Sequence, residues 1–207
     1  MPIGLINGNT SGGGTRPPFS PRGIVSALRE VVDSPAATDD ELVGMVGGPL
    51  FPTGCEVHGN IEGLLAGDAV TLRLSARLRP VEGGRPGVVA DRFPPGVGSR
   101  EVSEFVASAV LRRPWSADLP DLDQRSRIAV SGIDDLSRGT ETRLVFTASK
   151  GADVGQLRER LATVYGLTME LRAQLPAPLP DVLKSWAATH SADDLTNSLS
   201  QLDQLLD

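Results

Sequence analysis

The sequence predicts an α+β fold in which two helices cover one face of a four-stranded antiparallel sheet. Two observations lead to this prediction. From Pro86 onward the residue patterns read strand, helix, strand, strand, helix, strand, which is the order of a split β-α-β/β-α-β module. The chain also has 207 residues, of which 40% are hydrophobic and 22% charged. That composition is typical of a globular protein and excludes a wholly disordered chain.

Two helices are expected to follow a glycine-rich loop over residues 1–20. Ser20 is a good N-cap and Pro21 suits the first helical position. Apolar residues then recur at helical spacing, at Ile24, Val25, Leu28, Val31 and Val32. A second helix is expected after Thr38, because Glu41 stands three residues later and the pair forms a capping box.

The next stretch is expected to hold a turn, a short helix and a half-buried strand. Phe51–Val57 reads as a turn that leads into a short strand, and Asn60–Ala66 as one or two helical turns ended by Gly67. In Val70–Leu78 apolar and polar residues alternate, which predicts one strand with one buried face.

The split module itself is expected over residues 86–175. Its strands are predicted at Gly87–Arg92, Ile128–Leu136, Thr142–Ala148 and Leu167–Ala173, with helices beginning at Ser99 and Asp153. Connections of this kind follow the right-handed crossover rule, which places both helices on the same face of the sheet.

The last part of the chain, residues 181–207, is expected to be helical after a linker stiffened by alternating prolines. One helix is predicted to begin at Asp181 and another at Ser191. The second helix would carry a narrow apolar stripe made of Leu195, Leu199, Leu202 and Leu206. That stripe either packs on its own domain or pairs with another helix. Residues 21–85 form the remaining segment, the N-terminal helices and strand.

Composition limits the possible functions. The net charge is −6, whereas a dedicated nucleic-acid-binding domain is usually basic. No apolar stretch approaches the ~20 residues of a membrane helix, and the N-terminus lacks a secretory signal pattern. The single cysteine, Cys55, fits a reducing compartment, so a cytoplasmic protein is expected. His58 and His190 lack metal-ligand partners at a useful spacing, and neither metal nor cofactor is expected.

Three patterns allow both a functional and a structural interpretation. Gly12-Gly13-Gly14 could cradle a phosphate, but no Lys-Ser/Thr follows it and a flexible loop is favoured. Asp134-Asp135 could bind a metal, but the two residues point to opposite faces of a strand end and a solvated turn is favoured. A phosphate-binding patch of Arg16, Arg22 and Arg29 is weighed against a solvated face, which the net charge favours.

Four blocks of the sequence resemble a known family. They are Pro2–Gly8 with Arg16-Pro17-Pro18, Gly48–Gly54, Ile61–Gly67 before the alternating strand, and Ser131–Leu136 with Arg143–Phe146. In this order they are similar to the tower-domain region of the gyrase A protein of bacteria and its topoisomerase IV counterpart, the type IIA topoisomerases. The most specific piece is Phe51-Pro52-Thr53-Gly54 after a Gly-Pro pair. The resemblance implies a gyrase-A tower-like α+β fold.

The departures from the family pattern bear on function. Family members cleave DNA with a tyrosine that follows an arginine in an upstream winged-helix domain, whereas the only tyrosine here is Tyr165. The resemblance therefore implies that this chain alone is not an enzyme. Arg16 stands where the family has an isoleucine that wedges between base pairs, and Asp68 stands in a turn that is basic in the family. The implied candidates for DNA contact are Arg16, Pro17, Pro18 and Arg22.

These observations favour a non-catalytic gyrase A-like protein that acts by binding. The expected partners are gyrase or topoisomerase IV subunits, a second copy of the chain in a homodimer, or DNA bound weakly. A regulatory or protective role toward the topoisomerase would follow. Two alternatives remain open. The chain could be one piece of a split type II topoisomerase with a separately encoded tyrosine-bearing chain, or a decoy that binds a gyrase-directed antibiotic or toxin.

Overall fold

A computed structural model of the chain describes residues 5, 8–11, 14–34, 36–111, 129–139, 141–164 and 166–190. The chain divides into two compact units, and each consists of separate stretches of sequence. Unit 1 comprises Met1–Phe51, His58–Leu72 and Leu171–Asp207, and unit 2 comprises Pro52–Val57 and Arg73–Glu170. The chain therefore passes between the units several times.

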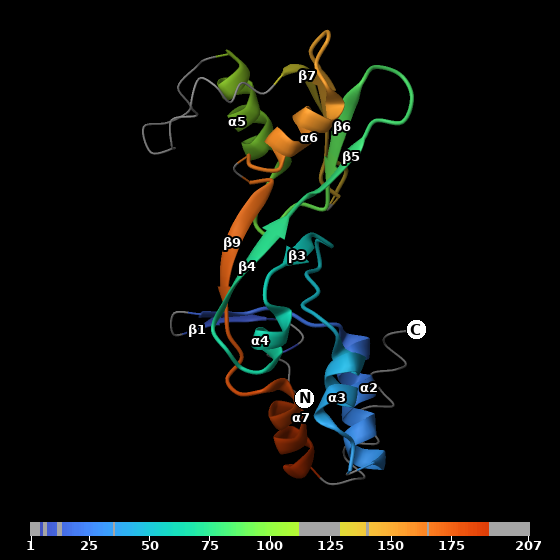
Figure 1. The fold of residues 1–207 in the computed structure, drawn as a ribbon, viewed down its shortest axis with the longest axis vertical. Coiled ribbons are helices and arrows are strands. Elements are labelled where there is room, and N and C mark those ends of the chain that lie inside the picture. Colours follow the sequence, from blue (N-terminus) through green and yellow to red (C-terminus); the bar gives the residue numbers. More distant parts are fainter. Residues whose placement is uncertain are drawn as a thin grey trace. The chain divides into compact units, whose positions relative to one another are not determined.

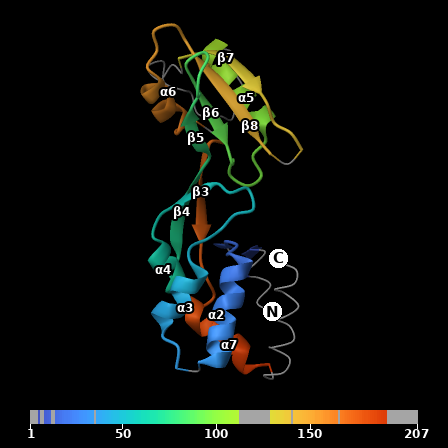
Figure 2. The same ribbon diagram turned by 90° about the vertical axis from the view of Figure 1, so that its right-hand side faces the viewer.

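Three helices of unit 1 pack together: α2 (Pro21–Asp33), α3 (Asp39–Val46) and α7 (Leu179–Ala188) (Figure 2). The predicted starts of α2 and α3 are confirmed. The Ser20 side chain accepts a hydrogen bond from the Gly23 N–H, and Thr38 and Glu41 form the capping box. Apolar residues of all three helices are buried: Ile24, Leu28, Leu42, Leu179 and Leu183. A short helix, α4 (Ile61–Leu65), is capped by Asn60.

A five-stranded sheet has the strand order β1 (Asn9–Ser11), β2 (Gly14–Arg16), β9 (Thr168–Ala173), β4 (Val70–Ser75) and β3 (Glu56–His58). Strands β1 and β2 form an antiparallel hairpin, and β2 runs parallel to β9. The hairpin lies within the stretch that the sequence indicated as a loop. Strands β4 and β9 each begin in one unit and end in the other.

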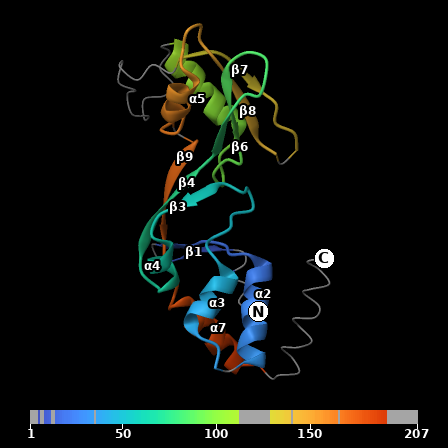
Figure 3. The same ribbon diagram turned by 45° about the vertical axis from the view of Figure 1, so that its right-hand side comes forward.

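Unit 2 contains a four-stranded antiparallel sheet, in the order β5 (Arg77–Pro80), β6 (Gly87–Asp91), β8 (Arg143–Ala148) and β7 (Val130–Asp135). Helices α5 (Ser99–Leu111) and α6 (Val154–Leu161) lie on one side of it (Figure 1 and Figure 3). Val88 and Ala90 of β6 pair with Phe146 and Leu144 of β8, and all four side chains are fully buried in the core beneath these helices. The predicted α+β class, with two helices on one face of a four-stranded sheet, is confirmed.

The prediction of the fourth strand of this sheet was wrong. Residues 167–173 were expected to complete it, but β9 belongs to the five-stranded sheet, and β5 takes the place beside β6. The predicted single strand Val70–Leu78 is divided between Ser75 and Arg77, so β4 and β5 join different sheets. The alternation of apolar residues continues across this division, which is why the pattern alone does not reveal it.

Smaller differences concern element ends. Asp134 and Asp135, which were expected to be solvated at a strand end, are the exposed last residues of β7. Ser99 was expected to cap α5, but it is the first residue of that helix and its hydroxyl donates to Asp135. Helix α7 begins at Leu179, before the expected Asp181. The stripe of Leu195, Leu199, Leu202 and Leu206 and the residue Tyr165 lie outside the described residues.

Candidate functional site

The residues proposed for DNA contact lie around the start of α2 in unit 1. Arg16 ends β2 and is partly exposed, while Arg22, on the first turn of α2, is exposed. Pro17 and Pro18 are both buried. The carbonyl of Pro18 accepts a hydrogen bond from Leu50 N–H, so this proline is part of the local scaffold of unit 1. The two arginines are therefore the members of this set with side chains exposed to a ligand.

The Phe51–Gly54 motif forms a turn that combines buried and exposed residues. Phe51 is buried, Pro52 and Thr53 are exposed, and Gly54 has a φ of 68°. The next residue, Cys55, is buried, and burial raises the pKa of its thiol above the usual value. Gly54 fits here because a left-handed backbone is unstrained in glycine.

The side chain of Arg92 lies across this turn. A Cβ added at Gly54 would stand 3.4 Å from Cδ of Arg92 and 3.7 Å from its Nε. Arg92 follows the last residue of β6 and has a φ of 53°, and among the described residues it is the non-glycine residue with a positive φ. No sequence pattern indicates Arg92, because a positive φ at a non-glycine residue leaves no pattern in a single sequence.

A buried carboxylate on β6 joins two arginines of β5. Nε of Arg77 lies 2.7 Å from Oδ1 of Asp91, and a terminal nitrogen of Arg79 lies 2.6 Å from Oδ2. Asp91 is 9% exposed. Burial of Asp91 opposes its ionisation, but the hydrogen bonds and charges of Arg77 and Arg79 outweigh burial, and the pKa of Asp91 lies below its usual value. This ion pair is a fixed feature of the sheet, on the face opposite α5 and α6.

The Asp91 ion pair was likewise not predicted from the sequence, although a signal for it exists. Arg77 and Arg79 are two residues apart, so they share one face of a strand, and Asp91 ends the adjacent buried strand. Once β5 is placed beside β6, the register aligns Arg77 with Asp91. The wrong assignment of the fourth strand concealed this arrangement.

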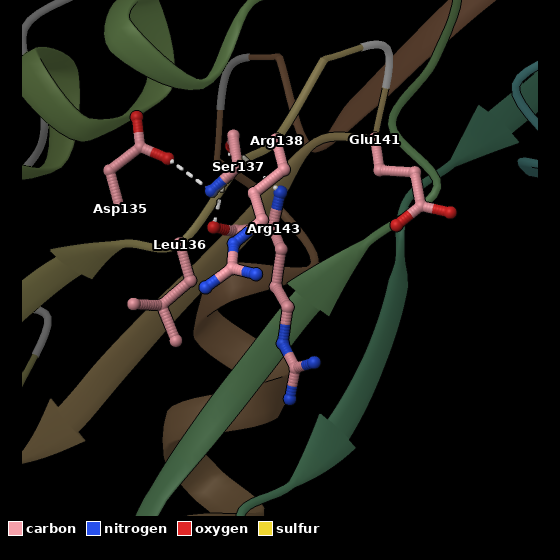
Figure 4. Close-up of a pocket in the computed structure, with 6 residues that line it drawn as sticks. All are labelled: Asp135, Leu136, Ser137, Arg138, Glu141 and Arg143. Carbon is pink, nitrogen blue, oxygen red and sulfur yellow. Dashed lines mark hydrogen bonds between the residues drawn. The ribbon is translucent and has the colours of Figure 1, made fainter.

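An open depression lies at the β7–β8 hairpin (Figure 4). Its lining residues are Asp135, Leu136, Ser137, Arg138, Glu141 and Arg143. Asp135 accepts hydrogen bonds from the Ser137 N–H and from the Ser99 hydroxyl, which connect the hairpin to α5 and lower the pKa of Asp135. The lining combines two acids with two bases, so it favours neither cations nor anions.

The described residues hold no group of three or more His, Cys, Asp or Glu side chains arranged to bind a metal ion. None of the helices in the described part of the chain combines the length and the apolar character needed to cross a bilayer. Every buried side-chain nitrogen and oxygen of these residues has a hydrogen-bond partner. Within the described residues we identify no set of nucleophile, base and acid.

The sequence of this chain is similar to those of topoisomerase subunits. The chain is 28% identical to a topoisomerase subunit, TopoM, of Mycolicibacterium smegmatis, over 97% of this chain and 27% of that protein. It is 27% identical to the gyrase A protein of Streptococcus pyogenes, over 69% of this chain and 18% of that protein. It is 28% identical to the gyrase A protein of Granulibacter bethesdensis, over 55% of this chain and 13% of that protein.

The homologues of this chain are topoisomerase subunits. The resemblance to gyrase A that the sequence blocks indicate is therefore confirmed. Comparison with models of known protein families gives no match. The chain spans between about an eighth and about a quarter of the length of these relatives, so it corresponds to a limited region of a gyrase A-like protein.

Proposed function

We propose that this chain is a non-catalytic gyrase A-like protein that acts by binding topoisomerase subunits. The observation that supports the proposal is the match over 97% of the chain to a topoisomerase subunit, in a sequence whose single tyrosine follows valine instead of arginine. Strand passage needs a tyrosine that can form a covalent bond to DNA. The 207 residues therefore supply a part of the topoisomerase surface without its nucleophile, and a regulatory or protective role follows.

Charge supports protein partners over DNA. All of the net negative charge arises in the stretches of unit 1, which also contain Arg16 and Arg22. Duplex binding depends on several cations that neutralise phosphates, and nearby carboxylates oppose it. We expect any duplex binding to be non-specific, with a dissociation constant on the order of 10⁻⁴ to 10⁻⁶ M at physiological salt. Binding of this strength would be secondary to a protein interaction.

The test uses the gyrase and topoisomerase IV subunits encoded in the same genome. Each purified subunit is immobilised, and binding of the 207-residue chain is measured together with the supercoiling activity of the assembled enzyme. The proposal expects binding to one or more of these subunits and a change in activity. It also expects that the chain alone neither relaxes nor cleaves plasmid in the presence of ATP. Absence of binding to all subunits, or a covalent DNA adduct on Tyr165, would contradict it.

A homodimer is the second part of the proposal, and it rests on the leucine stripe of the C-terminal segment. Sedimentation of the wild type and of Leu199→Asp, with thermal melts of both, tests it. A dimer that becomes a folded monomer in the variant supports the proposal. A wild type that remains monomeric at high concentration, with a variant that melts far lower, shows instead that the stripe packs on its own domain.

A split topoisomerase is the second candidate, because the match to TopoM covers nearly the whole chain and that relative is named as a topoisomerase subunit. In this case a separately encoded chain with an arginine-tyrosine pair would restore DNA cleavage when mixed with the present chain. Arg16→Ile provides a further probe, since an apolar wedge favours DNA bending. Cleavage by the mixture, and stronger cleavage with Arg16→Ile, would favour this candidate over a regulatory protein.

A further inference from the structure

One side of α2 carries a row of alternating arginines and valines. Its members are Arg22, Val25, Arg29 and Val32, which are spaced by three, four and three residues. This spacing is typical of the residues through which one helix packs along another. We call these four residues the α2 seam. Its arginines are exposed, Val25 is buried and Val32 is half-buried, so apolar side chains lie beside accessible charges.

The α2 seam faces away from α3. A Cβ added at Gly23 would stand 2.8 Å from the carbonyl oxygen of Met45, so Gly23 marks the side of α2 that contacts α3. Successive residues of a helix are rotated by about 100°, which places the seam residues about 180° to 260° around the axis from Gly23. Helix α7 also packs on α2, and it leaves both seam arginines exposed (Figure 2). The charged edge of the seam is therefore accessible to a further helix.

The C-terminal segment, residues 191–207, has the complementary pattern in its sequence, although it lies outside the described residues. The four leucines of its stripe are spaced by four, three and four residues, and the segment carries four acids and neither lysine nor arginine. In an α-helix the stripe would be about 17 Å long, against about 15 Å for the α2 seam. The stripe and the seam thus match in period and length, and their charges are opposite.

Charge also decides between the surfaces that the stripe could contact. Two stripes packed on each other would bring acids together, because every charged residue of the segment is an acid, and like charges destabilise a helix pair. On the α2 seam, arginine stems can pack on leucines while their guanidinium groups bond to carboxylates. In a helix, Asp194 and Asp203 would lie about 14 Å apart along the axis. Arg22 and Arg29 lie about 11 Å apart along α2, a difference that arginine side chains can span.

The end of α7 favours a second copy as the source of the seam. The N–H groups of Thr189 and His190 donate hydrogen bonds to the carbonyls of Trp186 and Ala187, so the chain continues the last turn of α7 as far as His190. Docking on α2 of the same chain would require a tight reversal directly after this point. A segment that continues outward meets the α2 seam of a second copy without such a reversal.

We propose that the C-terminal segment of each copy packs on the α2 seam of the second copy. This inference rests on the homodimer proposed above and names the surface that its leucine stripe contacts. Two such contacts are related by a twofold axis, so each copy gives one segment and receives one, and the assembly closes as a dimer.

The experiment is sedimentation velocity of the full chain with reversed charges. Arg22→Glu/Arg29→Glu places acids on both contacting surfaces, and Asp194→Arg/Asp203→Arg places bases on both. We expect each double variant to raise the dissociation constant of the dimer by about tenfold or more, because attraction becomes repulsion at both contacts. Circular dichroism melts report whether each variant remains folded.

A mixture of the two double variants tests which copy supplies the segment. The acidic segment of the first variant meets the arginines that the second retains on α2, and the basic segment of the second meets the glutamates of the first. We therefore expect a heterodimer with a dissociation constant close to that of the wild-type dimer, although each variant alone is monomeric. Docking within one chain gives no heterodimer, since each chain keeps like charges on both surfaces, and this result would overturn the inference.

The control is Arg85→Glu/Lys150→Glu, which makes the same change of charge at two exposed positions of unit 2 and should leave the dissociation constant unchanged. A dimer that persists in both double variants would overturn the inference and leave the homodimer intact. A wild type that remains monomeric at high concentration overturns both. Binding to topoisomerase subunits is measured separately, so the first part of the proposed function does not depend on either result.

Discussion

Unit 1 and unit 2 stabilise their folds with different uses of charge. In unit 1 the charged groups are at the surface, where Thr38 and Glu41 cap α3 and Lys184 lies 2.7 Å from Asp39 on the outside of the helices. In unit 2 a carboxylate is buried in the sheet and bound by two arginines. Water screens the exposed pairs of unit 1, so we expect them to contribute less to stability than the ion pairs of Asp91.

The largest expected effect is in the core of unit 2. Phe146 is fully buried between α5, α6 and the sheet, so Phe146→Ala should lower the free energy of unfolding by about 3–5 kcal/mol. Leu28→Ala in α2 should cost about 2–5 kcal/mol and serves as the matched change in unit 1. Urea unfolding followed by circular dichroism measures both. Two separate transitions in Phe146→Ala would show that the units unfold independently, and a single transition that they are coupled.

The next largest effect on stability is expected where the backbones of β6 and β8 lie close together. A Cβ at Gly87 would collide with the carbonyl oxygen of Phe146 on β8, so Gly87→Ala should destabilise by about 1–3 kcal/mol. Gly132, on β7, has room for a methyl group, whose nearest neighbour is Thr147 at 3.8 Å. Gly132→Ala should therefore be neutral or stabilising by about a few tenths of a kcal/mol. Equal melting temperatures for the two variants would contradict the described packing of β6 on β8.

The buried ion pair should make the stability of unit 2 depend on pH. Asp91→Asn leaves Arg77 and Arg79 without their anion, and it should cost about 1–3 kcal/mol near neutral pH, since both arginines are partly exposed. The pKa of Asp91 is lowered in the folded chain, so its stabilisation is present above the unfolded value of about 3.9 and is lost as the pH falls through the folded value.

The measurement is the free energy of unfolding of the wild type and of Asp91→Asn at several pH values. The difference between the two should be constant from about pH 7 to about pH 5 and should shrink below about pH 4. Asp135 and Glu41 also have lowered pKa values, but both proteins share them and their effect cancels. A difference that grew toward acid pH would refute the assignment.

The smallest expected effect is in unit 1. Thr38→Ala removes the side-chain half of the capping box and should cost about 1 kcal/mol. Lys184→Met removes an exposed ion pair with Asp39 and should change stability by about 0.5 kcal/mol or less. Differential scanning calorimetry of the two variants ranks them. If Lys184→Met lowered the melting temperature more than Thr38→Ala, the surface charges of unit 1 would contribute more to stability than their exposure indicates.

Local signals made the starts of several helices predictable. The cap residues Ser20, Thr38 and Asp153 act on nearby N–H groups, so their partners are readable within about four residues of sequence. The order of the strands was harder to predict, because β5 and β9 both carry half-buried residues and no local signal determines which of them pairs with β6. Long-range register decides that choice, and with the wrong strand order the pairing of Asp91 with its two arginines could not be predicted.

The residues of the candidate site were also predictable from the sequence only in part. The Phe51–Gly54 motif was recognised by its resemblance to gyrase A, but its contact with Arg92 depends on a backbone angle and on a side chain distant in sequence. Arg16 and Arg22 were found from the family pattern, and the structure leaves both side chains accessible while Pro17 and Pro18 are buried. Whether the two arginines meet DNA stays a prediction.

Strands β4 and β9 give the chain the architecture of an inserted module. The long stretch of unit 2, residues 73–170, departs along β4 and returns along β9, and the two strands are neighbours in one sheet. Entry and exit of this stretch are thus joined by a hydrogen-bonded ladder, an arrangement that suits the insertion or exchange of the segment between them. A chimera that joins Leu72 to Leu171 through a short turn would be the corresponding deletion, and a related module grafted at the same two positions would be the corresponding exchange.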